Sequence, residues 1–223
     1  MRTALVTGAN RGIGLAMVKE LLDNGYKVIA LSKTIENLVE IRNENLKIYK
    51  LNLIDIERVT KTIKEIEQGC SVDILINNAG VGCFKKIEDY QMEEWNEVLF
   101  LNLTVPFILI KQFLPSMKKK KYGRIINIGS DADSFPFLEA SAYCASKYGL
   151  RGMTECLRLE LKQTSVNVTT ISPGRVDTFF NGKYPGCRPM SLKPKDIAKQ
   201  VLFILEQDER CNIEQIKLSS SLE

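Results

Sequence analysis

Three side chains in the second half of the chain have the types and spacing needed to move a proton to or from an oxygen. Tyr143 and Lys147 lie four residues apart in Y-C-A-S-K, and Ser130 lies thirteen positions before the tyrosine. Residues four apart share one face of a helix, so the ammonium is expected near the phenol. A cation about 4 Å away contributes roughly 4 kcal/mol at an effective dielectric of about 20. That lowers a phenol pKa of roughly 10 toward neutrality, where acid–base catalysis works best.

The same pattern has a simpler explanation, because a Tyr–Lys pair often occurs by chance on a protein surface. The catalytic interpretation of the pair requires Ser130 to hold the reacting oxygen, and it requires further motifs that indicate an enzyme. The chain contains no histidine, so the tyrosine and lysine would carry the proton transfer without one.

A glycine-rich turn near the N-terminus has the layout of a nucleotide-binding loop. A short apolar run ends at Gly8, Gly12 and Gly14 follow, and residues 15–22 show a helical pattern. Glycines let the backbone turn sharply and approach a ligand, and the N-terminus of the next helix favours an anion. This order of strand, glycine turn and helix predicts dinucleotide binding.

Short β-branched runs alternate with helical periods along the chain, which predicts an α/β fold. We expect a Rossmann-like, doubly wound, mostly parallel sheet flanked by helices, as one domain over residues 1–223 that includes the substrate site. The expected strands lie near 3–7, 27–32, 47–52, 73–77, 123–129, 166–172 and 213–218. The expected helices lie near 12–24, 35–43, 56–67, 92–119, 142–163 and 194–206.

Composition narrows the functional classes. The chain has 223 residues, 44% of them hydrophobic, and a scattered net charge of +4 that does not suggest nucleic-acid binding. Its six cysteines follow no disulfide or zinc spacing, so no metal is expected, and the thiols are typical of a reduced, cytoplasmic protein. Packing is the expected role of Cys83 and Cys144, with a redox role as the alternative. No signal peptide and no segment of membrane-spanning length are expected.

Several motifs occur together in one order: Thr7-Gly-x-x-x-Gly12-Ile13-Gly14, then Asn77-Asn78-Ala79-Gly80, then Asn102, Ser130, Tyr143 and Lys147, then Pro173-Gly174-Arg175-Val176-Asp177-Thr178. In these motifs the chain, from about residue 3 to about residue 205, resembles the short-chain dehydrogenase/reductase family, of the type called classical. The resemblance implies an oxidoreductase that passes a hydride between a nicotinamide cofactor and a carbonyl or secondary alcohol.

The resemblance also assigns roles to four catalytic residues. Ser130 would polarise the substrate oxygen, Tyr143 would donate or accept its proton, and Lys147 would lower the tyrosine pKa and hold a ribose. Asn102 would anchor a water molecule in the proton relay. Pro106, four residues later, has no N–H for the Asn102 carbonyl, so a kink that leaves this carbonyl free is expected.

The expected cofactor is NADP(H). The second strand ends in Ala30-Leu31-Ser32-Lys33-Thr34, without the aspartate that NAD-preferring relatives carry, and Arg11 adds a second cation. Glu36 nearby is expected to neutralise part of this charge. By resemblance, Asn52 and Leu53 lie near the adenine. The full set of expected cofactor-binding residues is Gly8, Asn10, Arg11, Gly12, Ile13, Gly14, Ser32, Lys33, Asn52, Leu53, Asn78, Ala79, Gly80, Tyr143, Lys147, Pro173, Gly174, Val176 and Thr178.

The substrate is the least determined part. Expected pocket walls are residues 81–84, 131–138 and 179–190, with Asp131 and Asp133 available to a polar or cationic group. Carbonyl or ketone reduction is the main expectation. The alternatives are a 3-oxoacyl thioester reductase of fatty-acid-type metabolism and a non-catalytic nicotinamide-binding redox sensor. The helix near 103–118 is apolar on nearly all sides, which favours a homodimer, or a tetramer.

Overall fold

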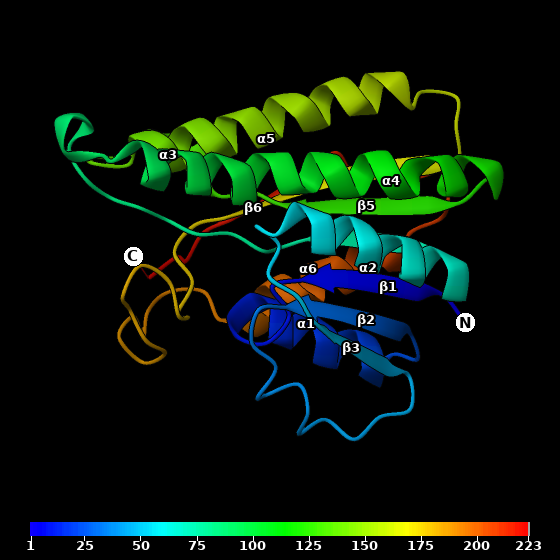
Figure 1. Cartoon of the computed structure of the whole chain (residues 1–223). Helices are drawn as coiled ribbons and strands as arrows, with labels where there is room; N and C mark the ends of the chain where they lie inside the picture. The colour runs from blue at the N-terminus through cyan, green and yellow to red at the C-terminus, as the bar shows by residue number, and fades with distance from the viewer. Residues whose placement is uncertain (223) are drawn as a thin grey trace.

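A computed structural model describes residues 1–222 of the chain. Its centre is a seven-stranded sheet, in the order β3-β2-β1-β4-β5-β6-β7, in which every paired neighbour is parallel. The strands are β1 Thr3–Thr7, β2 Lys27–Ser32, β3 Leu46–Lys50, β4 Ile74–Asn77, β5 Gly123–Ile128, β6 Val166–Pro173 and β7 Gln215–Leu218. The predicted Rossmann-like, doubly wound sheet is confirmed, and it is wholly parallel within the described residues (Figure 1).

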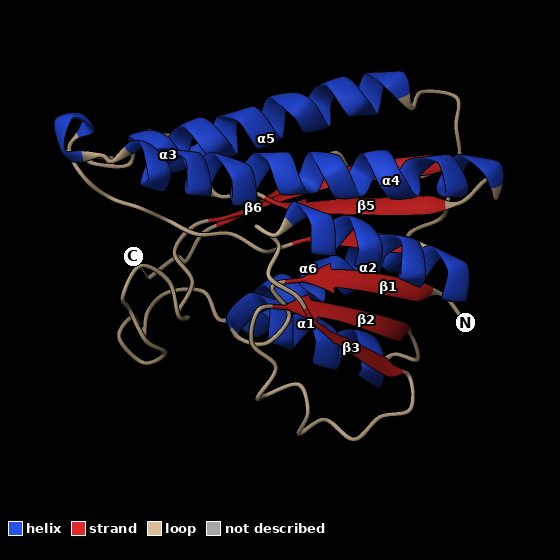
Figure 2. Ribbon diagram, viewed as in Figure 1, coloured by secondary structure: helices blue, strands red, loops and turns tan. Residues whose placement is uncertain are grey.

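Helices cover both faces of the sheet, as Figure 2 shows. They are α1 Gly12–Asp23, α2 Ile56–Gly69, α3 Met92–Leu99, α4 Val105–Lys119, α5 Ser141–Glu160 and α6 Pro194–Glu206. One hydrophobic core joins α1 and α6 to one face, and a second joins α2, α4 and α5 to the other. The central strands β1, β4 and β5 are buried along their whole length, which explains their continuous aliphatic sequences.

The predicted helix near 35–43 is wrong. This segment forms isolated turns, because the side-chain Oδ1 of Asn10 accepts the backbone N–H groups of Asn37 and Leu38. Leu38 is fully buried under the sheet, which fixes the segment by tertiary contact.

A continuous helix runs through α3 and α4, with a π-helical turn at Phe100–Thr104 between them. The N–H of Val105 donates to the carbonyl of Phe100 in the wider π spacing. Pro106, which has no N–H, lies two residues after the end of this turn, so the structure has a π-helical turn where a kink was expected.

The expectation that no segment is long enough to span a membrane is wrong by length and composition. The helix Met92–Lys119 has 28 residues and a mean hydropathy of 1.7 in its most apolar stretch. Its buried residues, including Leu109 and Phe113, belong to the core against the sheet. Apolar helices that cover a sheet meet the same criterion.

Candidate active site

All the predicted motifs gather at the carboxyl ends of the parallel strands. The glycine turn follows β1, Asn78 to Gly80 follow β4, Ser130 follows β5, and Gly174 follows β6. In Figure 1 this edge is the one that faces the orange loop near residues 178–193. Ligands of open α/β sheets bind in the crevice at this edge.

The glycine turn is packed so tightly that side chains do not fit. Gly8 and Gly12 have positive φ angles of +64° and +56°, and a Cβ on Gly14 would lie 2.2 Å from the carbonyl oxygen of Gly8. The turn leads directly into α1, whose N-cap residue Arg11 makes no side-chain capping bond and whose first turn holds no acidic residue. Backbone N–H groups at such a helix start suit the pyrophosphate of a dinucleotide.

Thr7 and Asn78 tie this turn to the end of β4. The Thr7 hydroxyl accepts the N–H groups of Asn78 and Ala79 at 2.9 and 3.0 Å, and the Asn78 amide donates to the Thr7 carbonyl at 2.8 Å. No separate role was predicted for Thr7. Its place in the T-G-x-x-x-G motif was the available signal.

The loop after β6 closes over the same turn. A Cβ on Gly12 would lie 2.2 Å from the Thr178 hydroxyl oxygen, so this threonine lies directly against the glycine turn. Val176 is buried and bridges to Leu192, while Gly174 donates its N–H to Leu218 of β7 at 2.7 Å. The structure therefore brings the first and last predicted cofactor segments together.

Ser130, Tyr143 and Lys147 lie together and are all largely buried. The Tyr143 and Lys147 side chains come from the first two turns of α5, and Ser130 comes from the loop directly after β5. The Tyr143 hydroxyl forms a side-chain hydrogen bond with Ser130. The Lys147 ammonium donates to the carbonyl of Ile128 at 2.8 Å and lies 5.7 Å from the centre of the tyrosine ring.

The predicted direction of the tyrosine shift is wrong for this structure. The pKa of Tyr143 is raised to about 12, mainly by burial; the Ser130 hydrogen bond opposes this rise, and the nearby Asp131 carboxylate adds to it. Burial also lowers the pKa of Lys147 to about 8. Desolvation is the largest influence on the phenol, and the Lys147 ammonium on which the prediction relied donates to the backbone carbonyl of Ile128 instead. The phenol is therefore held protonated near neutral pH, as a proton donor requires.

Asn102 lies in the π-helical turn with 1% of its surface exposed. Its Oδ1 accepts the N–H of Val81 at 2.9 Å, and its Nδ2 donates to the Val81 carbonyl at 2.8 Å and to the Ser146 hydroxyl at 3.0 Å. The side chain thus fixes the loop after β4 against α5. Ser146, which was not among the predicted site residues, also donates to the carbonyl of Tyr143 at 2.7 Å.

An aromatic wall covers Tyr143. The rings of Phe84 and Phe180 lie 5.6 and 5.5 Å from the tyrosine ring, and 6.3 Å from each other. These two residues come from two of the predicted wall segments. Other aromatic residues of the predicted wall segments lie elsewhere: Phe179 packs edge-on against Tyr184 and under the Arg11 guanidinium, and Phe135 is exposed.

The two acidic residues after Ser130 have different environments. Asp131 is half-buried and accepts the Ser130 hydroxyl proton at 2.9 Å. Asp133 is fully buried and accepts hydroxyl groups from Ser134 and Ser172. The expectation that Asp133 contacts the substrate is therefore wrong, because its carboxylate points into the protein.

Asn10 was expected to contact the cofactor, but its side chain is committed elsewhere. Its amide nitrogen donates to Thr34 and to the Glu36 carboxylate at 3.0 and 3.1 Å, and its oxygen accepts the N–H groups described above. The side chain shapes the loop after β2. Arg11 and Lys33 are exposed, and Ser32 is buried at the end of β2.

The remaining predicted adenine residues follow β3. Asn52 is half-buried and Leu53 is buried, and the Asn52 carbonyl accepts the N–H of Asp55, the N-cap of α2. Ile13 lies in the first turn of α1 and packs against the core.

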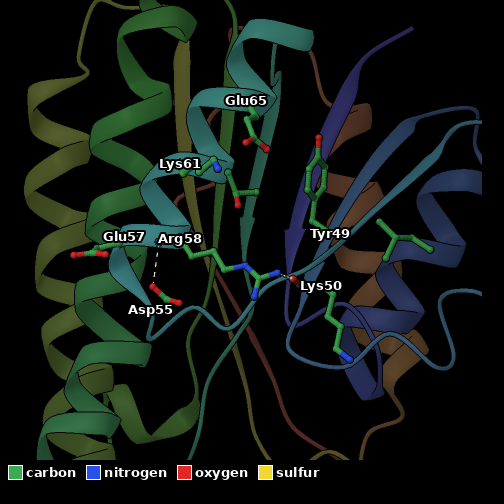
Figure 3. A pocket seen from close by; sticks show the side chains of 9 residues that line it. Tyr49, Lys50, Asp55, Glu57, Arg58, Lys61 and Glu65 are labelled. Atoms are coloured by element: carbon green, nitrogen blue, oxygen red, sulfur yellow. Dashed lines mark hydrogen bonds between the residues drawn. The ribbon is translucent and has the colours of Figure 1, made fainter.

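A surface hollow of about 670 Å³ lies between β3 and α2, away from the catalytic residues (Figure 3). It is lined by a balanced set of charges, and the Arg58 guanidinium within it already donates to the Lys50 carbonyl at 3.2 Å. None of the predicted catalytic or cofactor residues lines it. Size alone does not make it the active site.

The structure describes all six cysteines, and all are unpaired. Among residues 1–222, no group of three or more cysteine, aspartate or glutamate side chains is placed to hold a metal ion.

Comparison with known proteins agrees with this geometry. The sequence model of the family described as short chain dehydrogenase matches residues 2–186. An uncharacterized oxidoreductase of Staphylococcus aureus (strain USA300) is 34% identical over 220 residues, which cover 96% of this chain and 95% of that one. The chain belongs to the short-chain dehydrogenase family, and it is an oxidoreductase of that family.

Two solved structures show how close the fold is. An alcohol dehydrogenase from the archaeon Thermococcus sibiricus, complexed with 5-hydroxy-NADP, superposes with a TM-score of 0.92 at 28% identity, covering 100% of this chain and 98% of that one. A 4-hydroxyisoleucine dehydrogenase complexed with NADH has a TM-score of 0.91 at 26% identity, covering 99% and 98%. Both nicotinamide cofactors thus occur among similar structures.

Proposed function

We propose that the protein reduces a carbonyl group to a secondary alcohol with NADP(H) as the hydride donor. The observation that carries the proposal is the buried group of Ser130, Tyr143 and Lys147 beside a glycine turn that excludes side chains. A bound nicotinamide supplies the hydride. The chain supplies position and a proton.

Each catalytic residue has one task in this reaction. Tyr143, protonated near neutral pH, gives its proton to the oxygen of the substrate as the alcohol forms. Ser130 donates a hydrogen bond to the same oxygen, and to do so its single proton must leave Asp131. Lys147 in its cationic form stabilises the phenolate left behind and holds a ribose hydroxyl. The Asn102 carbonyl, which Pro106 cannot bond, binds the water that returns a proton.

The aromatic wall defines the class of substrate. Phe84 and Phe180 give the reacting carbon an apolar contact, and Asp131 gives a polar edge next to Ser130. A small ketone or aldehyde with an apolar part fits this description. Oxoacyl thioesters remain an alternative, and hydroxy amino acids join the test because one similar structure is named for 4-hydroxyisoleucine.

The direct test is a panel of ketones, aldehydes, oxoacyl thioesters and hydroxy amino acids, with turnover followed by absorbance of the reduced cofactor. Turnover of at least one class, lost in Tyr143→Phe, supports the proposal. If both reduced cofactors bind but no compound is turned over, the redox-sensor alternative is favoured and the proposal fails.

The preference for NADP(H) rests on charge near the expected adenosine ribose. Arg11 and Lys33 are exposed cations on the glycine turn and after β2, and that end of β2 has no acidic residue. The Glu36 carboxylate offsets part of this positive charge, because a hydrogen bond from the Asn10 side chain holds it beside the glycine turn. Two cations acting on one phosphate, each contributing about 1.5–3 kcal/mol, outweigh one exposed acid.

Binding isotherms of NADPH and NADH measure this preference. We expect NADPH to bind more tightly, and the difference to shrink in the double variant Arg11→Ala, Lys33→Ala. Lys27→Ala, an exposed lysine at the opposite end of β2, is the matched control and should leave it unchanged. Equal affinities in the native protein would contradict the assignment.

We further propose that the protein acts in the cytoplasm as a homodimer. The outer faces of α4 and α5 expose the apolar side chains Phe107, Tyr148 and Leu159, which a second copy would cover.

A further inference from the structure

Asp133 is a carboxylate that the reaction described above does not use. It lies in the short 3-10 turn Asp131–Asp133 after Ser130, with 0% of its surface exposed. A buried charge is costly unless hydrogen bonds and an opposite charge compensate it. Its retention in the wall of the active site therefore calls for a reason.

The surrounding hydrogen bonds fix Asp133 as an acceptor on both oxygens. Arg151 and Lys217 donate to the Ser134 hydroxyl at 3.1 and 3.0 Å, so that hydroxyl must give its own proton to Asp133, at 2.6 Å. On the other side, Gln215 donates to the Ser172 hydroxyl at 3.1 Å, and Ser172 donates to the second oxygen. Arginine and lysine have no acceptor, so the bonds on the Ser134 side have only one direction. Hydrogen bonds donated to both oxygens of a carboxylate stabilise its charged form.

The Asp133 carboxylate and the Lys147 ammonium both lie against the backbone of residues 128–129. The ammonium donates to the carbonyl of Ile128, and the next residue is Gly129, where a Cβ would lie 2.9 Å from Oδ2 of Asp133. Burial lowers the pKa of Lys147, and the Asp133 carboxylate is the charge that opposes this, raising the lysine pKa.

The other charged groups around Asp133 come from three elements. On α5, Tyr143, Lys147 and Arg151 face the turn, and Arg151 also donates to the Asp133 carbonyl at 2.8 Å. β7 contributes Lys217, and the turn itself contributes Asp131. β6 contains no ionisable residue.

We propose that Asp133 is a positioning residue whose buried negative charge keeps the Lys147 ammonium protonated at physiological pH. Without this charge, a lysine enclosed by β5 and α5 would be neutral in part of the molecules, and the proton relay would lose its cation. The Ser134 and Ser172 hydroxyls and their outer donors hold the carboxylate in its charged form.

The role given to Lys147 rests on the proposed function, but the first measurement needs neither substrate nor cofactor. The protein is labelled at its lysine ε-carbons, and the Lys147 resonance is assigned by its loss in Lys147→Arg. In the native protein we expect it to titrate near pH 8. In Asp133→Asn the midpoint should fall by about one pH unit, at the low end of the effect of a nearby opposite charge. An unchanged midpoint would overturn the proposal.

Two control variants separate charge from structure. Asp131→Asn removes the neighbouring carboxylate, which affects Tyr143 and not Lys147, so the Lys147 midpoint should stay in place. Ser134→Ala removes one hydrogen bond to Asp133 and leaves its charge, and it should shift the midpoint less than Asp133→Asn does. If Ser134→Ala shifts it equally, the role of Asp133 is structural and the proposal is wrong.

A second measurement is the pH dependence of kcat, once a substrate is known. The alkaline limb of the kcat profile for reduction should move to lower pH in Asp133→Asn by the same amount as the resonance, with KM little changed. A uniform loss of kcat at every pH, without displacement of the limb, would contradict the proposal. Should Asp133→Asn fail to fold, Asp133→Glu retains the negative charge, so the Lys147 midpoint should stay near its native value, and a fall of about one pH unit despite the retained charge would contradict the proposal.

Discussion

At the residue scale, Tyr143 is a phenol made a weaker acid by its surroundings. Its ring is enclosed by Phe84 and Phe180, and burial raises its pKa to about 12. A protonated phenol beside Ser130 suits reduction of a carbonyl at neutral pH, in which the enzyme gives a proton away. Oxidation of the alcohol needs the phenolate, which is scarce at that pH.

Removing this proton donor tests its role. Tyr143→Phe should reduce turnover at least about a hundredfold, the effect of losing a general acid, while cofactor affinity stays nearly intact. Tyr148→Phe is the matched control on the same helix, since that ring is 41% exposed and its hydroxyl lies outside the site. Initial rates and binding isotherms of both variants measure the effect. More than about a tenth of native activity in Tyr143→Phe would rule out the mechanism.

The pH dependence of reduction follows from the same two groups. Reduction requires Lys147 as a cation, and burial lowers its pKa to about 8, so the rate should fall as pH rises through about 8. Tyr143 stays protonated across that range, because its pKa is raised to about 12. Oxidation should instead increase with pH. A reduction rate that stays flat to about pH 10, near the ordinary lysine pKa, would show that Lys147 is not the group that limits it.

At the element scale, the π-helical turn Phe100–Thr104 places Asn102 where it bonds both Val81 and Ser146. Pro106 denies the Asn102 carbonyl its usual helical donor, and the wider turn accommodates this. Such turns inside α-helices are frequent at functional sites. The apolar sequence around it holds the turn against the sheet.

Restoring the missing N–H should disturb this arrangement. Pro106→Ala lets an ordinary helical bond form to Asn102, and we expect turnover to fall about tenfold, as for the loss of one hydrogen bond. Pro115→Ala, at an exposed site later in the same helix, should stabilise the fold and leave turnover unchanged. Rates and urea unfolding midpoints of the pair measure both effects. Equal turnover in the two variants would mean that the π-helical turn has no part in catalysis.

An element could be predicted from the sequence where its own residues determine its structure, and could not where a contact with a distant residue determines it. The parallel strands were predicted because their aliphatic runs are continuous, and the catalytic motifs because they follow strands directly. The structure of the segment near 35–43 could not be predicted in this way. The side chain of Asn10, far away in sequence, accepts the backbone N–H groups of Asn37 and Leu38.

Asp131 and Asp133 illustrate the same limit at the site. They look alike in sequence, two residues apart in one loop, but Ser172 of β6 lies against one of them and makes it internal. The direction of the Tyr143 shift was also beyond the sequence, because spacing gives proximity of charge and says nothing of burial.

At the scale of the whole molecule, the two faces of the sheet differ in what they expose. Helices α4 and α5 cover the same face of the sheet (Figure 1), and they expose Phe107 at 51% and Leu159 at 63%. A dimer formed there would brace the helix that carries Tyr143 and Lys147.

Analytical sedimentation measures whether the protein is a dimer or a monomer. We expect a dimer at micromolar concentration, and dissociation when Phe107→Glu places a charge in the interface. Phe203→Glu is the matched control, because Phe203 is exposed at 49% on α6, which covers the opposite face of the sheet. A native protein that sediments as a stable monomer would contradict the dimer.

Hydride transfer itself is tested most directly by following the transferred atom. The protein is incubated with a carbonyl compound from the panel and NADPH that carries deuterium at the transferable position, and the product is analysed by mass spectrometry. The account predicts an alcohol with one deuterium on the former carbonyl carbon, formed by the native protein and by Tyr148→Phe and almost absent with Tyr143→Phe. Tight binding of the cofactor without deuterium in any product, across the whole panel, would contradict it.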